Sequence, residues 1–405
     1  MRKGLLRELT LFILYVSLAL IIVGGGCSSP SEAIPTPSPT ASPVVTPTPT
    51  LTPTPLPAAP TPTPTPLSGK IEIISSSTEA DFPESITFSL ETKSPGEINQ
   101  IALRYKVRKV SLAQVATEVE PEFDESDHVA ASWTWDTRKA PLPPGAEIQY
   151  QWLVEDSEGR KTQSTWATFV FQDLRYNWST ISEGDVTLFW YNGDQSLAQQ
   201  LIDAAQGGLD KLAADTGAHL DKAVKIYVYG SHEDLIDALI YPQAWTGGVA
   251  FTEYGILAIG IPPESLEWGK GAMVHELAHL VTYQMTVNPY GDIPTWLDEG
   301  ISMYAEGTLE EEYQTALTEA ISGGELISMQ SLSSGYPTNS EEACLLYAES
   351  HSVVDFLIHT YGRDKMLELL EVFKEGASYD SALLKVYSFD TKGLEARWHT
   401  YIGAG

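Results

Sequence analysis

The chain has 405 residues and a formal net charge of −30, with 43% hydrophobic and 10% aromatic residues. This composition indicates ordinary globular folding. The strong negative charge argues against nucleic acid as a partner, because the phosphates would be repelled. Cys27 and Cys344 are the only cysteines, and a lipidated Cys27 would leave Cys344 without a disulfide partner, most simply as a core residue.

Residues 1–27 have the pattern of an export signal. Three basic residues within the first seven precede an apolar run from Leu9 to Val23. The run is short for a membrane-spanning helix, which needs about 20 apolar residues. The small residues before Cys27 resemble a bacterial lipoprotein cleavage site, which implies a lipid anchor at Cys27; an uncleaved signal anchor is the alternative. Both predict an extracytoplasmic, membrane-anchored protein of the bacterial cell envelope.

Residues 28–68 consist almost entirely of Pro, Thr, Ser and Ala, as in Thr61-Pro62-Thr63-Pro64. No core can form in such a segment. It is expected to stay extended, near polyproline II, as a disordered linker that spans about 3 Å per residue. Residues 69–405 are left to fold, which favours two domains.

Residues 69–173 show an apolar period of two, which is typical of half-buried strands. Turn clusters such as Lys93–Gly96, Pro141–Gly145 and Asp156–Gly159 separate the strands. The pattern predicts an all-β sandwich, loosely similar to immunoglobulin or fibronectin type III modules. Such a domain would bind a surface glycan or protein, or only position the rest of the chain. The alternating residues are Ile86, Phe88 and Leu90; Ile101, Leu103, Tyr105 and Val107; Val129, Ala131, Trp133 and Trp135; and Ile148, Tyr150, Trp152 and Val154.

Residues 174–405 are expected to form an α+β domain with a mixed sheet. Strands are predicted at 186–191 and 224–229, and a hairpin is predicted from 247–251 and 256–261. The predicted helices cover 195–216, 234–239, 340–360, 364–374 and 392–402, with capping signals at the ends of the long one.

Within this domain, His275 and His279 bracket Glu276 in an apolar run. At 3.6 residues per turn, positions four apart lie on one face of a helix, so both imidazoles can reach one ion. Glu276 leaves the same turn slightly rotated, beside the metal as a base rather than as a ligand. The H-E-x-x-H pattern also arises by chance, so a third ligand is needed to support it. Glu299, in Pro294-Thr295-Trp296-Leu297-Asp298-Glu299-Gly300, opens a second apolar helix and can supply that ligand.

Together these motifs resemble the gluzincin metallopeptidases, and among them the peptidase MA-like families with a W-L-x-E-G segment. The resemblance implies a zincin-like domain that binds Zn²⁺ through His275, His279 and Glu299, with Glu276 as general base and acid. Asp298 is then placed to accept a hydrogen bond from a ligand histidine. Some gluzincins carry an Asp one turn after the ligand Glu, where this chain has Met303, so the surroundings of the ligands differ from that pattern.

Two further assignments follow from the same resemblance. Tyr347-Ala348-Glu349-Ser350 looks like the Y-x-x-S pattern of relatives, and a Tyr347 hydroxyl that faces the metal would stabilise an oxyanion. The stretch 247–251 is the candidate sheet edge that pairs with an extended substrate. A core tyrosine and a glycine-rich turn are the alternative interpretations.

The sequence therefore predicts a cell-surface zinc metallopeptidase that acts on peptide or protein substrates. No amine-binding glutamate motif is evident near Gly247, which favours an endopeptidase over an aminopeptidase. Two other classes stay open: a catalytically inactive zinc-binding surface module, and an adhesion or glycan-binding protein in which the β-sandwich carries the function.

Overall fold

The computed structural model describes residues 69–110, 114–243, 246–335 and 340–404. The predicted signal, Cys27 and the Pro/Thr-rich linker lie outside these residues. Among the described helices, none combines the length and the apolar character needed to cross a membrane.

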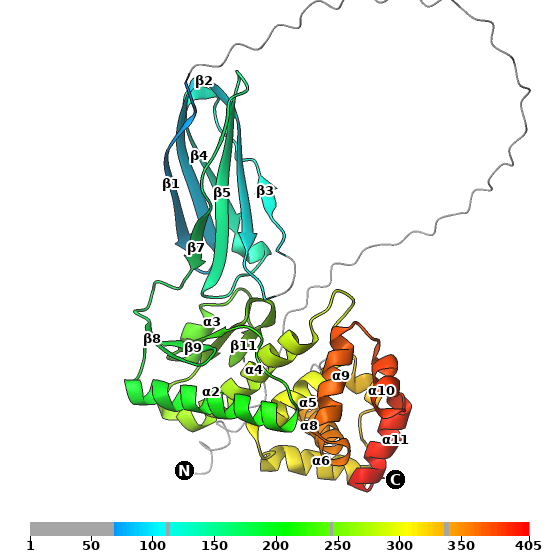
Figure 1. Cartoon of the computed structure of the whole chain (residues 1–405). Coiled ribbons are helices and arrows are strands. Elements are labelled where there is room, and N and C mark those ends of the chain that lie inside the picture. The colour runs from blue at the N-terminus through cyan, green and yellow to red at the C-terminus, as the bar shows by residue number, and fades with distance from the viewer. Residues whose placement is uncertain (1–68, 111–113, 244–245, 336–339, 405) are drawn as a thin grey trace, which may run out of the picture. The chain divides into compact units, whose positions relative to one another are not determined.

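The first sheet contains seven strands, all paired antiparallel (Figure 1). The strand order is β1-β2-β5-β6, with β3 and β4 also paired to β2 and β7 paired to β5. The residues predicted to alternate do face one core, where Ile86, Phe88, Leu103 and Trp152 are fully buried. The strands are β1 (Glu72–Asp81), β2 (Ser85–Val107), β3 (Thr117–Val119), β4 (Ser126–Asp136), β5 (Ala146–Asp156), β6 (Lys161–Gln163) and β7 (Ala167–Phe171).

The turn expected at Lys93–Gly96 is wrong, because this stretch lies inside the 23-residue strand β2. The stretch coincides with a shift in the register of the strand pairing. The pairing of β2 with β4 is regular as far as Lys93 and resumes at Ile98, and beyond this point β2 pairs with β5. A Pro-Gly pair therefore interrupts the ladder here without ending the strand.

The second sheet is mixed, as predicted, and has the strand order β11-β12-β10-β9-β8. Strands β9, β10 and β12 run parallel, whereas β8 and β11 pair antiparallel at the two edges. The predicted strand and helix segments agree with the structure to within two residues at most ends. The elements are β8 (Ser179–Glu183), β9 (Val186–Trp190), α2 (Gln195–Asp215), β10 (Val224–Tyr229), α3 (His232–Ile236), β11 (Gly248–Phe251) and β12 (Ile256–Gly260).

Helix α4 (Leu266–Thr286) carries the H-E-x-x-H motif and lies between two hydrophobic cores. Met273 and Leu277 pack with α2 and the strands of the second sheet. Ala278 and Val281 pack instead with the helices that follow in the chain. A helix that is apolar on nearly every side is expected to be buried in this way.

The rest of the chain is helical (Figure 1). The predicted helices at 340–360, 364–374 and 392–402 are present almost as expected. Sequence analysis did not place α6 or α10, nor strand β8 in the second sheet. The helices are α5 (Thr295–Glu306), α6 (Glu311–Gly323), α7 (Met329–Leu332), α8 (Ser340–Tyr361), α9 (Arg363–Lys374), α10 (Tyr379–Tyr387) and α11 (Thr391–Ile402).

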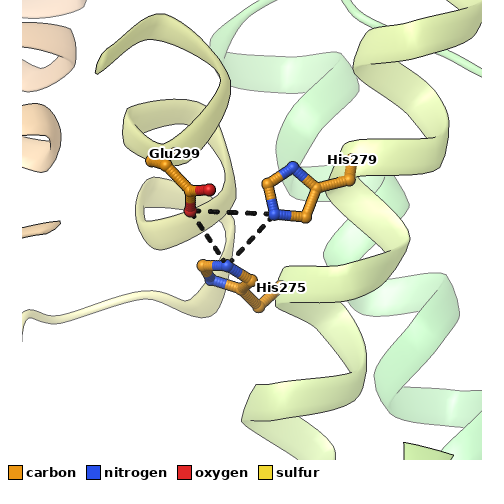
Figure 2. Close-up of side chains that lie close together, drawn as sticks. All are labelled: His275, His279 and Glu299. Atoms are coloured by element: carbon orange, nitrogen blue, oxygen red, sulfur yellow. Dashed lines mark hydrogen bonds and ion pairs between the residues drawn. The ribbon is translucent and has the colours of Figure 1, made fainter. Parts of the chain in front are cut away.

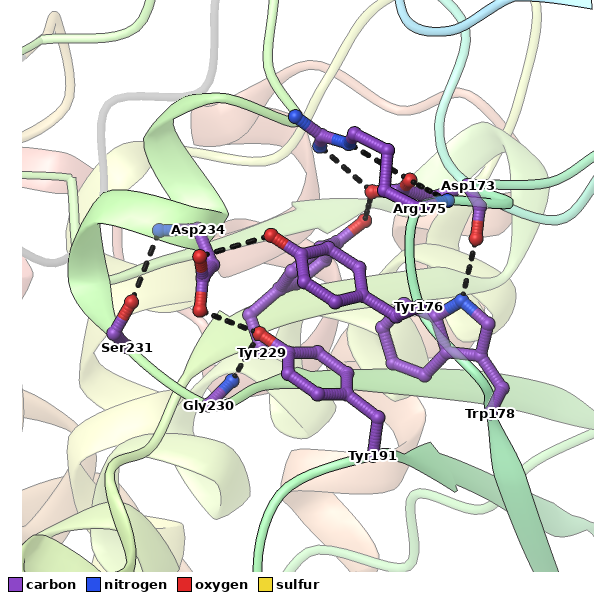
Figure 3. A network of polar contacts seen from close by, with 9 residues as sticks. All are labelled: Asp173, Arg175, Tyr176, Trp178, Tyr191, Tyr229, Gly230, Ser231 and Asp234. Carbon is purple, nitrogen blue, oxygen red and sulfur yellow. Dashed lines mark hydrogen bonds and ion pairs between the residues drawn. The ribbon is translucent and has the colours of Figure 1, made fainter.

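A network of tyrosines and aspartates fixes the segment that leads into β8 (Figure 3). The hydroxyls of Tyr176 and Tyr191 both donate to the Asp234 carboxylate, over 2.8 and 2.7 Å, and the two rings stack with centroids 4.0 Å apart. Burial and the hydrogen bond to Asp234 raise the pKa of Tyr176 to about 12. Asp173, fully buried, pairs with Arg175. These contacts connect helix α3 to the residues just before β8, which is the first strand of the second sheet in the sequence.

The approach of α5 to α8 depends on Gly300, which directly follows Glu299. A Cβ at Gly300 would lie 2.4 Å from the Ser350 carbonyl oxygen and 2.5 Å from Val354 Cγ2. We expect Gly300→Ala to lower the free energy of unfolding by about 1–3 kcal/mol, because the two helices must separate. In contrast, Gly207 in α2 has open space around its Cβ position, so Gly207→Ala is expected to add about 1 kcal/mol.

Denaturant unfolding of both variants measures the difference. Equal stabilities for Gly300→Ala and Gly207→Ala would contradict the close α5–α8 packing. The comparison is informative because both substitutions add the same methyl group inside a helix, so their intrinsic helix propensities largely cancel.

Candidate metal centre

Helices α4 and α5 present the three predicted ligands to one point. His275 and His279 project from one face of α4, and Glu299 comes from the first turns of α5, opposite them (Figure 2). Pro294 precedes α5 in an extended conformation and its carbonyl accepts the first helical hydrogen bonds, so the helix starts just before its ligand.

The donor atoms of these residues are close together and buried. His279 Nε2 lies 3.2 Å from His275 Nε2, and Glu299 Oε2 lies 3.3 Å from His275 Nε2 and 3.7 Å from His279 Nε2. The exposed fractions are 5% for His275, 6% for His279 and 0% for Glu299. Tetrahedral coordination with bonds of about 2.0–2.2 Å places donor atoms about 3.3–3.6 Å apart. The spacing therefore fits one small cation held by three ligands.

The second nitrogen of each histidine ring contacts a carboxylate. His275 Nδ1 lies 2.6 Å from Glu306 Oε1, and His279 Nδ1 lies 3.1 Å from Asp298 Oδ2. Ser302 Oγ donates to the Asp298 carbonyl and can accept from His279 Nδ1 at 3.2 Å. A proton on each Nδ1 leaves both Nε2 lone pairs directed at the ligand point, which is the tautomer that metal sites use.

The electrostatics of the site also favour a cation. Burial lowers the pKa of His275, but the hydrogen bonds to Glu299 and Glu306 outweigh it, so the pKa lies well above its ordinary value. Burial likewise lowers the pKa of His279, yet Asp298 and Glu299 raise it to about 9. The carboxylates around these rings thus stabilise positive charge strongly. A bound divalent cation would supply this positive charge, and the imidazoles would then remain neutral as ligands.

Glu276 lies beside the ligands without joining them. It is 2% exposed, and its Oε1 has no hydrogen-bond partner among the described residues. Burial raises the pKa of Glu276 to about 7, although His279 and His275 act in the opposite direction. A buried carboxylate oxygen without a partner is costly. A water molecule or substrate group held at the ligand point would supply the missing hydrogen bond.

Strand β11 passes directly over this carboxylate. A Cβ at Gly248 would lie 3.2 Å from Glu276 Cγ, and a backbone hydrogen bond from Ala250 lowers the pKa of Glu276. Strand β11 is the first strand in the order of its sheet and therefore an edge strand, as predicted for the stretch 247–251. Glycine at 248 lets the strand approach the carboxylate closely.

Tyr347 in α8 lies next to the site. Its ring centroid is 6.2 Å from that of His275, and the side chain is 7% exposed. Both residues line a cavity of about 100 Å³. His351, one turn further along α8, stacks on Tyr304 instead, with centroids 5.8 Å apart.

Sequence analysis did not find Glu306 or Ser302. Ser302 follows Glu299 by three residues and Glu306 follows it by seven, so both lie on the face of α5 that carries Glu299. That spacing was the available signal. This chain has Met303 where some gluzincins carry an aspartate, and Glu306, one turn later, supplies the carboxylate for His275 instead.

Loss of the Glu306 carboxylate is expected to weaken metal binding. Removing such an outer partner of a ligand histidine typically costs about 10- to 100-fold in metal affinity. We therefore expect Glu306→Ala to raise the dissociation constant for zinc by that factor, measured by competition with a chelating dye. Glu311→Ala, which removes an exposed carboxylate from α6, is the control and should bind as wild type. Equal affinities for the two variants would contradict the role of Glu306.

Comparison with known proteins shows that the C-terminal part of the chain is similar to a class of peptidases. The model of the Peptidase MA superfamily matches residues 204–404. The matched residues include α4 and α5, which carry His275, His279 and Glu299, and the match supports a peptidase. None of the curated proteins matches the sequence.

Similarities to solved structures are weak. Aminopeptidase A of Legionella pneumophila aligns over 81% of this chain and 50% of its own, with 9% identity and a TM-score of 0.33. An aminopeptidase N family protein from Idiomarina loihiensis aligns over 79% and 68%, with 10% identity and a TM-score of 0.27. OgpA from Akkermansia muciniphila aligns over 26% and 29%, with 16% identity and a TM-score of 0.20. The chain thus spans about half of the first protein and less than a third of OgpA, and likenesses this weak identify no activity.

Proposed function

We propose that this protein is a zinc-dependent metallopeptidase of the gluzincin type. The observation that carries the proposal is the set of three buried donor atoms, from His275, His279 and Glu299, at separations of 3.2 to 3.7 Å. Glu276 next to them supplies a carboxylate that is not needed as a ligand. Two histidines and one carboxylate leave a fourth position open, as hydrolytic zinc sites require.

Zinc held at this point would supply Lewis acidity, which makes water a nucleophile near neutral pH. The protein's own part of the mechanism begins at the Glu276 carboxylate, which accepts a proton from the attacking water. Glu276 then delivers this proton to the nitrogen of the leaving amine. The Tyr347 hydroxyl donates a hydrogen bond to the carbonyl oxygen as negative charge develops on it.

Strand β11 provides a place for the substrate backbone. As an edge strand it has unpaired backbone groups on one side, and an extended peptide can add to such an edge. The closeness of Gly248 to Glu276 then brings the peptide to the carboxylate. The lack of an amine-binding motif near Gly247 favours an endopeptidase.

The domain division and the location are part of the same proposal. Residues 69–173 would form an immunoglobulin- or fibronectin III-like domain, and residues 174–405 the peptidase. Lipidation at Cys27 would anchor both on the extracytoplasmic face of a bacterial cell envelope, with residues 28–68 as the spacer. Metabolic labelling with a fatty acid tests the anchor, because Cys27→Ser should abolish the label.

The activity is tested by incubating the protein with a mixed peptide library and identifying the products by mass spectrometry. We expect internal cleavage that a zinc chelator stops. Cleavage that is insensitive to chelation, or no cleavage by zinc-loaded protein, would contradict the proposed function.

A further inference from the structure

The cavity beside the metal centre extends from His275 along α4 to α6, and we call it the acidic cavity. Its inner wall is apolar and aromatic, and includes Ala272, Met303 and Tyr347, with exposed fractions of 6–7%. Because His275 forms one wall, a group in this cavity lies next to whatever is bound at the metal ligands. The cavity is therefore placed to hold a side chain of a substrate residue adjacent to the bond that is cut.

Three carboxylates also belong to the lining of this cavity. Glu267, Glu306 and Glu310 all line it. Glu267 pairs with Lys270 and Glu306 contacts His275, but Glu310 forms no ion pair with any described residue. Burial and the charge of Glu306 raise the pKa of Glu310. Glu310 thus adds to the cavity a carboxylate that has no cationic partner among the described residues.

A second observation points to a ligand independently of these charges. Tyr313 lines the same cavity and is 9% exposed, yet its hydroxyl has no hydrogen-bond partner among the described residues. The ring packs edge-on against Tyr347, with centroids 6.5 Å apart, so it is held in place. This hydroxyl is therefore available to accept a hydrogen bond from a donor group that enters the cavity.

These features together match one kind of side chain. A lysine or arginine has an aliphatic stem that covers apolar surface and a charged tip that stays near water. Its tip can donate several hydrogen bonds to carboxylates and to a tyrosine oxygen. The ring of Trp268, which also lines the cavity, adds a surface that cations favour. A free α-amino group has no stem and would leave the apolar wall uncovered.

We propose that the acidic cavity is a substrate subsite that accepts a lysine or arginine side chain next to the scissile bond, with Glu310 as a specificity-determining residue. This inference rests on the proposed peptidase function. It restricts that function to substrates with basic residues at the cleavage site.

The test compares blocked peptides that differ at one position. Peptides with an acetylated N-terminus and an amidated C-terminus carry lysine, norleucine or glutamate in the middle of an alanine-rich sequence. For the wild-type protein we expect kcat/KM for the lysine peptide to exceed that for norleucine by about tenfold, with cleavage next to the lysine. Norleucine is the matched substrate, because it keeps the stem and lacks the charge. Exposed ion pairs contribute modestly, so Glu310→Gln should reduce this preference by about threefold, and Glu310→Lys should abolish it.

The control variant is Glu311→Gln, which removes the same charge from the adjacent position of α6 and does not line the cavity. It should keep the preference of the wild type. Equal rates for lysine and norleucine peptides, or an equal loss of preference in Glu310→Gln and Glu311→Gln, would overturn the subsite. Cleavage restricted to peptides with a free N-terminus would overturn it in favour of an amine-binding role.

A binding measurement separates this inference from the proposed function. Calorimetry with Glu276→Gln protein gives the affinities for the lysine and norleucine peptides without turnover. Tighter binding of the lysine peptide that Glu310→Gln weakens, with no cleavage by the wild type, would support the subsite and contradict the peptidase function. Cleavage of the lysine and norleucine peptides at equal rates would support the peptidase function and contradict the subsite. Equal binding of both peptides, with no cleavage, would overturn both.

Discussion

Glu276→Gln is expected to lower kcat/KM for peptide hydrolysis by about 10²- to 10⁴-fold while the protein still binds zinc. The amide has nearly the shape of the carboxylate but cannot accept a proton. Glu276 contributes none of the three donor atoms, so the ligand set should be unchanged. The measurement is kcat/KM on a cleaved peptide, together with the zinc content of the same preparation.

Glu264→Gln is the matched control for this variant. Glu264 is an exposed carboxylate shortly before α4, so its replacement should leave hydrolysis at the level of the wild type. Full activity of zinc-loaded Glu276→Gln would show that another group moves the proton. Loss of zinc together with activity would show that Glu276 acts on the metal rather than as a base.

Removal of the metal is expected to have an equally large effect. A zinc chelator such as phenanthroline should reduce hydrolysis to background, since the Lewis acid contributes several kcal/mol and each 1.4 kcal/mol is tenfold in rate. Addition of zinc after removal of the chelator should restore the wild-type rate. His279→Ala lacks one of three ligands and should not be restored at the same zinc concentration.

His219→Ala is the control for that experiment. Its ring is largely exposed and pairs with Asp221, away from the ligand set, so this variant should lose and regain activity like the wild type. Activity of His279→Ala equal to that of His219→Ala after zinc addition would contradict the assignment of His279 as a ligand.

Much of the fold could be predicted because the periodic segments are strongly amphipathic. Helix α2 buries Leu197, Leu201 and Leu212 on one face, and β10 is apolar between two parallel neighbours. The missed elements lack such patterns. Strand β8 is an exposed edge strand with a single half-buried residue, Ile181, and α6 buries only Tyr313 and Ala320. Their positions depend on tertiary contacts that no local periodicity encodes.

The candidate site also contains residues that local sequence patterns predicted and contacts that depend on tertiary packing. Spacing along single helices predicted that His275 and His279 share a face, and a local motif pointed to Glu299. The contact between Glu306 and His275 joins two helices, so it depends on how α5 packs against α4. The position of Tyr313 against Tyr347 likewise depends on how α6 and α8 pack together. The sequence therefore predicted the three residues that the structure brings together, and the structure adds the groups that surround them.

The zinc content of the purified protein tests the central claim most directly. Elemental analysis of protein expressed with zinc available should find about one zinc per chain. In Glu299→Ala, prepared in parallel, the zinc should be lost or greatly reduced, because that variant lacks a donor atom that lies 3.3 Å from His275 Nε2. No zinc in the wild type, or full occupancy in Glu299→Ala, would contradict the metal centre built from α4 and α5.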